Sequence, residues 1–204
     1  PFPIQALAIP LALSGTDLIG QARTGTGKTL AFGTSLLHRL QASVEETGEP
    51  ASHGLPRALV ITPTRELALQ VTRDLELAGS RLNTRVLTIY GGTSYDEQLF
   101  ALEKGVDVAV GTPGRLLDLV NRRALDLSRV EVLVLDEADE MLDLGFLPDI
   151  EKLLAKTPQE RQSLLFSATM PAPILALARA TLNRPVNIRA EGADAQATVP
   201  DITQ

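Results

Sequence analysis

The sequence contains no cysteine and no tryptophan, and aromatic residues make up only 3% of it. Without cysteine the chain cannot form a disulfide framework, and two histidines alone do not supply a structural zinc site. No apolar run reaches the ~18 residues that a membrane-spanning helix needs, and no basic-then-apolar leader opens the chain. We therefore expect a cytoplasmic protein that does not contact a membrane.

Positive charge is also scarce. The 19 Lys and Arg residues are outnumbered by 25 Asp and Glu residues, which gives a formal net charge of -6. The chain as a whole therefore carries no electrostatic signal for nucleic acid, and any such binding must be local. A length of 204 residues with 44% hydrophobic residues is ordinary for one globular domain.

Short apolar segments rich in β-branched residues alternate with segments of helical character. This alternation predicts βαβ units, and the nearly continuous hydrophobicity of the segments is typical of parallel strands covered on both faces. We predict an α/β fold with a doubly wound, mostly parallel sheet. The predicted strands are residues 58–62, 86–90, 106–110, 132–135, 164–166 and 186–188.

Three connecting segments also have a predicted conformation. Apolar residues spaced by three and four positions predict an amphipathic helix over residues 65–78, with Thr64 as its N-cap and Gly79 at its end. A second helix is expected over residues 28–40. Residues 41–56 contain several glycines and prolines without periodicity, so we expect an exposed loop there.

One segment has the spacing of a phosphate-binding loop, except that alanine replaces the first glycine. Glycines inside it allow the backbone N–H groups to turn inward, its lysine can reach the β and γ phosphates, and its last hydroxyl can ligate magnesium. The alternative is a turn that merely connects a strand to a helix. This phosphate loop consists of Ala22, Arg23, Thr24, Gly25, Thr26, Gly27, Lys28 and Thr29.

A second motif favours the phosphate site over the simple turn. The apolar strand 132–135 leads directly into Asp136 and Glu137. A carboxylate at the end of a strand can hold hydrated magnesium, and an adjacent one can orient or deprotonate an attacking water. Alone, these residues would indicate a solvated loop. Both motifs in this order predict ATP hydrolysis.

The strand 132–135 ends in the acidic tetrad Asp136-Glu137-Ala138-Asp139. Further motifs stand in order along the chain: Pro3-Ile4-Gln5, the phosphate loop, Pro63-Thr64-Arg65-Glu66-Leu67, Gly91-Gly92, Thr112-Pro113-Gly114-Arg115 and Ser167-Ala168-Thr169. On these motifs the chain resembles the first RecA-like domain of the DEAD-box RNA helicases, which are named after the sequence of the tetrad, and in particular bacterial members of that family.

The resemblance implies ATP and Mg²⁺ as cofactors. Gln5 would read the adenine edge, and the whole phosphate loop would contact the nucleotide. Lys28 would bind phosphate, while Thr29 and Asp136 would hold magnesium, Asp136 through water. Glu137 would act on the attacking water, which makes Lys28, Asp136 and Glu137 the expected catalytic residues.

The resemblance also implies that RNA is the partner. Backbone N–H groups, hydroxyls and arginines suit phosphate and 2′-hydroxyl groups rather than base edges, and the few aromatics argue against a stacking platform. We therefore expect backbone recognition with little sequence preference. Helix capping and turn formation are the alternative roles. The expected RNA-binding residues are Pro63, Thr64, Arg65, Gly91, Gly92, Thr112, Pro113, Gly114 and Arg115.

Ser167 and Thr169 would couple the nucleotide state to RNA unwinding through hydrogen bonds with Asp139, as the family resemblance implies. Taken alone, the Ser167–Thr169 segment could simply cap the helix that Pro171 and Pro173 introduce.

For domain organisation we expect a RecA-like ATP-binding domain at residues 1–198 and the start of an interdomain linker at 199–204. A second RecA-like domain, in cis but outside this chain, would supply arginine fingers, so the chain alone should hydrolyse ATP poorly. Two alternatives remain at this point. One is a self-contained P-loop ATPase or kinase, and the other is an ATP-gated RNA clamp or scaffold.

Overall fold

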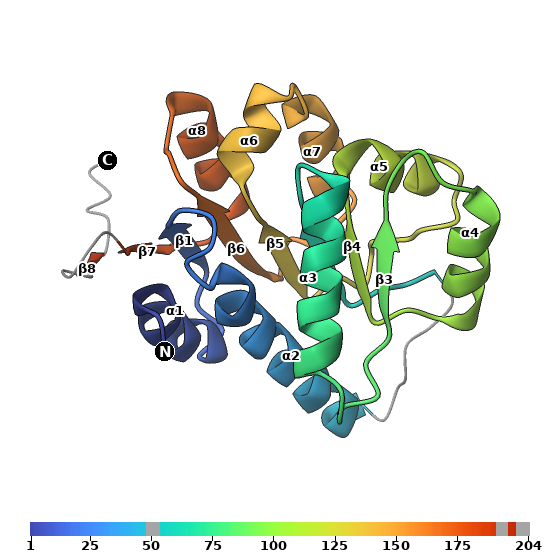
Figure 1. The fold of residues 1–204 in the computed structure, drawn as a ribbon, viewed down its shortest axis with the longest axis horizontal. Helices are drawn as coiled ribbons and strands as arrows, with labels where there is room; N and C mark the ends of the chain where they lie inside the picture. The colour runs from blue at the N-terminus through green and yellow to red at the C-terminus, as the bar shows by residue number, and fades with distance from the viewer. Residues whose placement is uncertain (48–53, 191–195, 199–204) are drawn as a thin grey trace.

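The computed structural model describes residues 1–47, 54–190 and 196–198. A central sheet lies between two layers of helices (Figure 1). The elements in chain order are α1 (Pro3–Leu13), β1 (Leu18–Gln21), α2 (Lys28–Thr47), β2 (Ala58–Ile61), α3 (Arg65–Ala78), β3 (Val86–Ile89), α4 (Tyr95–Lys104), β4 (Val108–Gly111), α5 (Pro113–Asn121), β5 (Val132–Leu135), α6 (Ala138–Asp143), α7 (Leu147–Leu154), β6 (Gln162–Ser167), α8 (Ala172–Thr181), β7 (Val186–Arg189) and β8 (Gln196–Thr198).

The sheet has the strand order β3-β4-β2-β5-β6-β1-β7-β8. Among the strands in the described part of the chain, β1 to β7 are parallel and the short edge strand β8 runs antiparallel to β7. The predicted doubly wound, mostly parallel α/β fold is therefore confirmed. All six predicted strands are present with small shifts in their ends, whereas β1 and β8 were not predicted.

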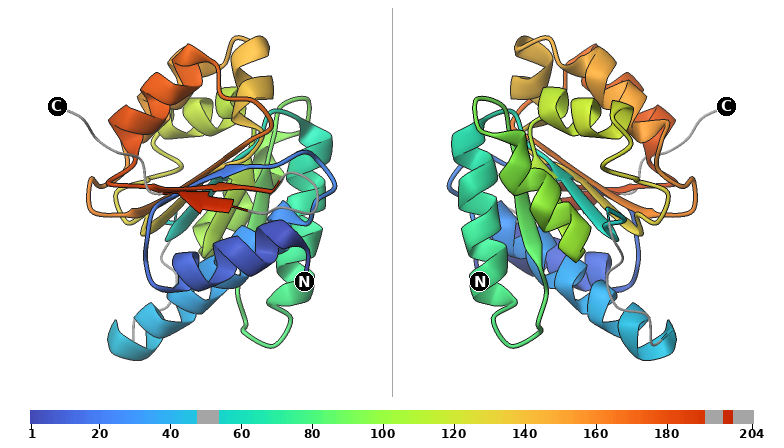
Figure 2. Two further views of the ribbon diagram at one scale, coloured as in Figure 1. Left: turned by 90° about the vertical axis from the view of Figure 1, so that its left-hand side faces the viewer. Right: turned by 90° about the vertical axis from the view of Figure 1, so that its right-hand side faces the viewer.

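Alternate residues of the central strands face two separate cores, one under each helical layer. In β5, Val132 and Val134 pack with α1, α2 and α3, whereas Leu133 and Leu135 pack with the side chains of α4 to α8. Figure 2 shows these two layers on opposite sides of the sheet. Burial on both faces explains why these strands are apolar throughout.

The predicted helix over 65–78 is confirmed as α3, with Thr64 at its N-cap. The Thr64 hydroxyl accepts a hydrogen bond from the backbone N–H of Leu67, at 3.2 Å. Of the apolar residues that predicted this helix, Val71 and Leu75 are buried, but Ala78 is exposed. The helix α2 begins at Lys28 as expected.

The prediction of an exposed loop over 41–56 is wrong for its first part, because α2 continues to Thr47. Residues 48–53 lie outside the described residues. The side chain of Gln41 donates a hydrogen bond to Glu45 one turn later, and the Ser43 hydroxyl donates to Glu131. The glycines and prolines that suggested a loop begin only at residue 48, so residues 41–47 contain no helix breaker.

The carboxyl ends of the parallel strands lie along one edge of the sheet, where loops in doubly wound folds commonly bind ligands. Every predicted motif after Gln5 follows one of the strands β1 to β6 at this edge.

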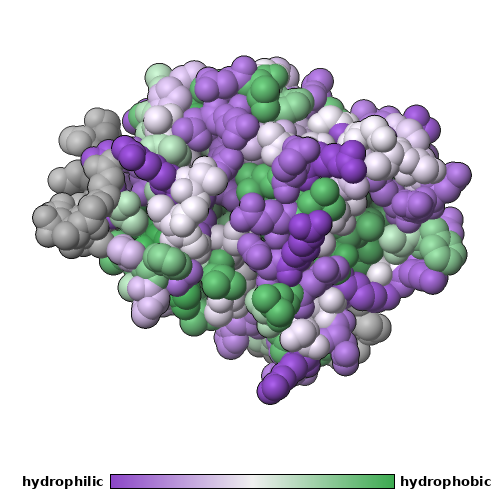
Figure 3. Space-filling view, in the orientation of Figure 1, coloured by the Kyte–Doolittle hydropathy of each residue, from purple (hydrophilic) through white to green (hydrophobic). Residues whose placement is uncertain are grey.

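The face seen in Figure 3 mixes polar and apolar areas, without one broad apolar region. Within the described residues, none of the helices combines the length and apolar character needed to cross a lipid bilayer.

Candidate functional site

The phosphate loop connects β1 to the first turn of α2. Gly25 and Gly27 have φ angles of 81° and 84°, which lie in the left-handed region that favours glycine. A Cβ atom on Gly27 would lie 2.5 Å from the side-chain nitrogen of Gln5 and 2.9 Å from the Phe2 ring, so any side chain here would displace these neighbours. Ala22, which replaces the first glycine of the motif, is buried and packs in the core under α1 to α3.

A buried ion pair joins the phosphate loop to the end of β5. The Lys28 Nζ atom lies 3.3 Å from Asp136 Oδ1 and 3.6 Å from Glu137 Oε1. The side chains of Lys28 and Asp136 are only 5% and 1% exposed. Neither Lys28 Nζ nor Asp136 Oδ1 makes a directed hydrogen bond within the described part of the chain. Two buried charged atoms thus retain bonding capacity for a ligand.

Burial raises the pKa of Asp136, and the neighbouring Glu137 carboxylate raises it further, while Lys28 acts in the opposite direction. Desolvation disfavours the ionised carboxylate, and a cation bound beside it would favour the ionised form and lower the pKa. The sequence-predicted residues Lys28, Asp136 and Glu137 therefore form one electrostatic unit.

Glu137 has a left-handed backbone conformation, with φ 54° and ψ 52°. This conformation is costly for a residue with a side chain, and such strain is often found at functional sites. The Thr24 hydroxyl donates a 2.6 Å hydrogen bond to Glu137 Oε1. This contact between the phosphate loop and the acidic tetrad was not predicted, because the two residues are 113 positions apart.

A cavity of about 350 Å³ opens between the phosphate loop, α1 and α3. Asp136 and Glu137 line it, and so do Gln70 and Asp74 of α3, which the sequence did not single out. Gln5 also lines the cavity. Its side chain donates to the Gly27 carbonyl at 3.1 Å and accepts from the backbone N–H of Phe2 at 3.0 Å. The Gln5 amide therefore contacts the loop backbone.

The segment after β6 is hydrogen-bonded to the acidic tetrad. The backbone N–H and the hydroxyl of Thr169 donate to Asp139 Oδ2 at 2.9 and 2.8 Å, and the Asp139 N–H donates to the Ser167 hydroxyl at 3.1 Å. Burial raises the pKa of Asp139, but hydrogen bonds from Thr169 and Ser167 outweigh it, and the net pKa is lowered. An ionised Asp139 thus connects the two strand ends.

The three segments expected to bind RNA follow β2, β3 and β4, which are neighbours at one end of the sheet. Gly91, Gly92 and Gly114 are exposed there, and the Arg65 guanidinium stacks 4.6 Å from the centre of the Tyr90 ring. The phosphate loop and the acidic tetrad follow β1 and β5 instead. The sheet edge therefore divides into a half near β1, β6 and β5 and a half near β2, β4 and β3.

Arg115 differs from the other predicted RNA-binding residues because its guanidinium points inward. It donates to the side chain of Gln98 and to the Thr93 carbonyl, both at 3.2 Å. It also lies 4.0 Å from the centre of the Tyr95 ring. The buried Gln98 was not identified from the sequence, since a glutamine within a helix carries no local signal of such a role.

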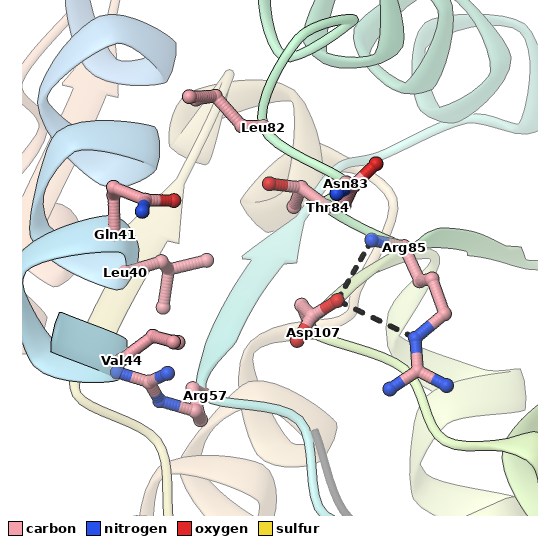
Figure 4. Close-up of a pocket in the computed structure, with 9 residues that line it drawn as sticks. All are labelled: Leu40, Gln41, Val44, Arg57, Leu82, Asn83, Thr84, Arg85 and Asp107. Atoms are coloured by element: carbon pink, nitrogen blue, oxygen red, sulfur yellow. Dashed lines mark hydrogen bonds and ion pairs between the residues drawn. The ribbon is translucent and has the colours of Figure 1, made fainter. Parts of the chain in front are cut away.

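A second hollow of about 270 Å³ lies at the opposite edge of the sheet, near the far end of α2 (Figure 4). Two of its lining arginines make opposite-charge contacts. Arg57 Nε lies 2.7 Å from Glu131 Oε1, and Arg85 Nε lies 3.6 Å from Asp107 Oδ2. None of the predicted site residues lines this hollow.

Comparison with known proteins identifies close relatives. The chain is 50% identical over 187 residues to "ATP-dependent RNA helicase CshA" of Listeria monocytogenes, which covers 92% of this chain and 34% of that protein. It is 48% identical over 202 residues to "DEAD-box ATP-dependent RNA helicase CshA" of Bacillus subtilis. This match covers 99% of this chain and 39% of the Bacillus protein. The chain thus spans less than half the length of these curated relatives.

Solved structures agree with the sequence relatives. A DEAD box protein from the hyperthermophile Methanococcus jannaschii superposes with a TM-score of 0.83 at 40% identity, over 94% of this chain and 50% of that one. A hypothetical ATP-dependent RNA helicase from Sulfolobus tokodaii gives a TM-score of 0.82 at 36% identity. The superposition covers 93% of this chain and 52% of that one. The family model "DEAD/DEAH box helicase" matches residues 2–177. The chain therefore belongs to the DEAD/DEAH box helicase family.

Proposed function

We propose that this chain is the ATP-binding half of an ATP-dependent RNA helicase. Residues 1–198 form its first RecA-like domain, and residues 199–204 begin the linker to a second RecA-like domain. The buried Lys28–Asp136 pair carries this proposal, because both side chains face a cavity beside a glycine-rich loop and keep unused bonding capacity. The names of the relatives, which are ATP-dependent RNA helicases, support the same conclusion.

The residues of the cavity fit ATP together with Mg²⁺. Nucleotide-bound magnesium takes only one or two protein ligands, since phosphates and waters fill its other positions. The Thr29 hydroxyl would be such a ligand, Asp136 would hold the ion through water, and Lys28 would neutralise phosphate charge. Within the described residues there is no cluster of three or more acidic or histidine side chains that would hold a metal alone. Bound magnesium would stabilise the charge on the phosphates.

Glu137 is the residue that we assign to the attacking water. Its carboxylate lies beside Lys28 and accepts the Thr24 hydroxyl, so its orientation is set by the phosphate loop. The strained backbone of Glu137 supports this role, because the turn after β5 directs two successive carboxylates toward the same loop. Gln5 contacts the phosphate loop directly and lines the cavity, which supports its assignment to the adenine.

RNA binds, in this proposal, at the strand ends near β2, β4 and β3, and the Ser167–Thr169 segment couples that binding to the nucleotide through Asp139. Exposed glycine backbone at residues 91, 92 and 114 suits phosphate contacts without reading bases. A self-contained ATPase or kinase is not favoured, because the family model and the relatives are helicases.

The Glu137→Gln variant tests the catalytic assignment. We expect ATP to bind as in the parent protein while turnover falls by about 10²-fold or more, because an amide cannot act as a general base. Nucleotide affinity and steady-state ATP hydrolysis would be measured in the presence of RNA and the second domain. Glu151→Gln is the matched control, since Glu151 is an exposed carboxylate on α7. Turnover that survived in Glu137→Gln would require another base.

A further inference from the structure

We propose that Gln98 and Arg115 are positioning residues for RNA binding: they hold the Gly91–Thr93 turn in the shape that presents its backbone N–H groups to a phosphate, and neither side chain contacts the RNA. This inference rests on the proposed RNA-binding function. It revises the expectation that Arg115 itself binds a phosphate.

Gln98 lies on α4 directly behind the turn and is only 5% exposed. Its side-chain nitrogen donates to the Tyr90 carbonyl at 3.2 Å and to the Thr93 hydroxyl at 3.1 Å. Its side-chain oxygen accepts a hydrogen bond from Arg115 at 3.2 Å. The amide uses both of its donors and its acceptor, so it has little capacity left for RNA.

Arg115 completes the network from the first turn of α5. One guanidinium nitrogen donates to Gln98, and another donates to the Thr93 carbonyl at 3.2 Å. The face of the guanidinium lies on the Tyr95 ring, and the Tyr95 hydroxyl donates to Asp118. A planar, forked cation satisfies all these contacts together, whereas the point charge of a lysine cannot.

The consequence for the turn follows from peptide geometry. A trans peptide directs its C=O and N–H groups to opposite sides. Because the Tyr90 carbonyl is held inward by Gln98, the N–H of Gly91 is directed outward. The Thr93 carbonyl, held inward by Arg115, directs the N–H of Ser94 outward in the same way. Neither N–H has a hydrogen-bond partner within residues 1–47, 54–190 and 196–198.

The exposure of the turn makes these N–H groups accessible to a ligand. Gly91, Gly92 and Ser94 are exposed, and a Cβ atom on Gly91 or Gly92 would meet nothing within 4 Å. Backbone N–H groups on an open turn are suitable donors to phosphate oxygens and carry no sequence preference. Their direction depends on the two anchored carbonyls, so loss of Gln98 or Arg115 would allow the turn to change its conformation.

The test measures binding of a labelled single-stranded oligouridylate by the full-length protein with a non-hydrolysable ATP analogue, over a series of salt concentrations. We expect Gln98→Ala and Arg115→Lys each to weaken RNA binding by about tenfold, as the loss of a buried hydrogen-bond network implies. The slope of log affinity against log salt should not change, because no charge–phosphate contact is removed. Affinity for the ATP analogue should also stay unchanged.

Gln162→Ala is the matched control. Gln162 is also a buried glutamine, 3% exposed, and its side chain donates to the carbonyls of Ala12 and Thr16. This variant should lose a comparable amount of thermal stability and keep the RNA affinity of the parent. An equal loss of RNA affinity in Gln162→Ala would show a general effect of destabilisation and overturn the proposal.

Two further results would contradict the inference. If Arg115→Lys kept the parent affinity while Arg115→Ala lost it with a salt slope smaller by about 0.7 to 1, Arg115 would contact phosphate directly. If the parent bound RNA and Gln98→Ala bound it equally well, the positioning role would be wrong while the proposed function stood. A parent protein that did not bind RNA would overturn both.

Discussion

At the scale of single residues, small side chains decide how closely the elements of this protein approach one another. Gly20 of β1 lies opposite Phe166 of β6 in the sheet. A Cβ atom on Gly20 would lie 2.5 Å from the Phe166 ring, which is buried and packs at 5.6 Å between centroids against Phe32. Glycine at this position therefore serves packing between neighbouring strands, next to the phosphate loop that follows β1.

We expect Gly20→Ala to lower the free energy of unfolding by about 1 to 3 kcal/mol, because the added methyl group overpacks a core that cannot move aside. Gly114→Ala is the control. Its Cβ atom would meet nothing within 4 Å, and alanine is preferred to glycine in a helix. Chemical denaturation of both variants would check this. Equal stability of Gly20→Ala and the parent would mean that Phe166 can shift.

At the scale of elements, two helices of the proposed RNA surface begin differently. Thr64 caps α3 through its side chain, whereas Thr112 at the N-cap of α5 makes no side-chain cap hydrogen bond. The alternative role in helix capping thus applies to Thr64 and not to Thr112. The Thr112 hydroxyl makes no hydrogen bond to the described residues, so it is available to a ligand.

The two threonines give a paired prediction. Thr64→Ala should lower the free energy of unfolding by about 1 kcal/mol, the usual cost of a lost N-cap. Thr112→Ala should leave thermal stability nearly unchanged and weaken RNA binding. Thermal melts and RNA titrations of both variants would measure this. A melting temperature that fell equally in the two variants would contradict the assignment.

At the scale of the whole molecule, one sheet edge brings the two proposed ligands together without mixing their sites. The phosphate loop and the acidic tetrad follow β1 and β5, and the proposed RNA segments follow β2, β3 and β4. The Asp139–Thr169 hydrogen bonds join the ends of β5 and β6 within the nucleotide half.

We expect this chain alone to bind ATP and to hydrolyse it slowly. Joining it to the second RecA-like domain should raise turnover in the presence of RNA, because an arginine supplied by a partner domain is worth about 10³ to 10⁵ in related phosphoryl-transfer enzymes. ATP hydrolysis with and without RNA, for this chain and for the joined protein, would test it. Fast hydrolysis by this chain without RNA would indicate a complete active site and favour the self-contained ATPase.

Much of the fold was predictable because its signals are local. The central strands are apolar throughout, and α3 carries both its periodicity and its cap. The strand β1 was missed because Gly20 and Gln21 end its apolar run after two residues, and β8 was missed because its three residues carry no apolar pattern. The extent of α2 was missed because helix breakers further along the chain suggested a loop.

By itself the sequence determined the α/β class, the order of the motifs and the kind of chemistry at the ends of the strands, because residue type and spacing are properties of the chain. Only the tertiary structure decided which residues contact one another. Thr24 contacts Glu137 across 113 positions, and Arg115 bonds inward to Gln98 rather than outward. Side-chain direction depends on how neighbouring strands and helices pack, and linear spacing does not contain that information.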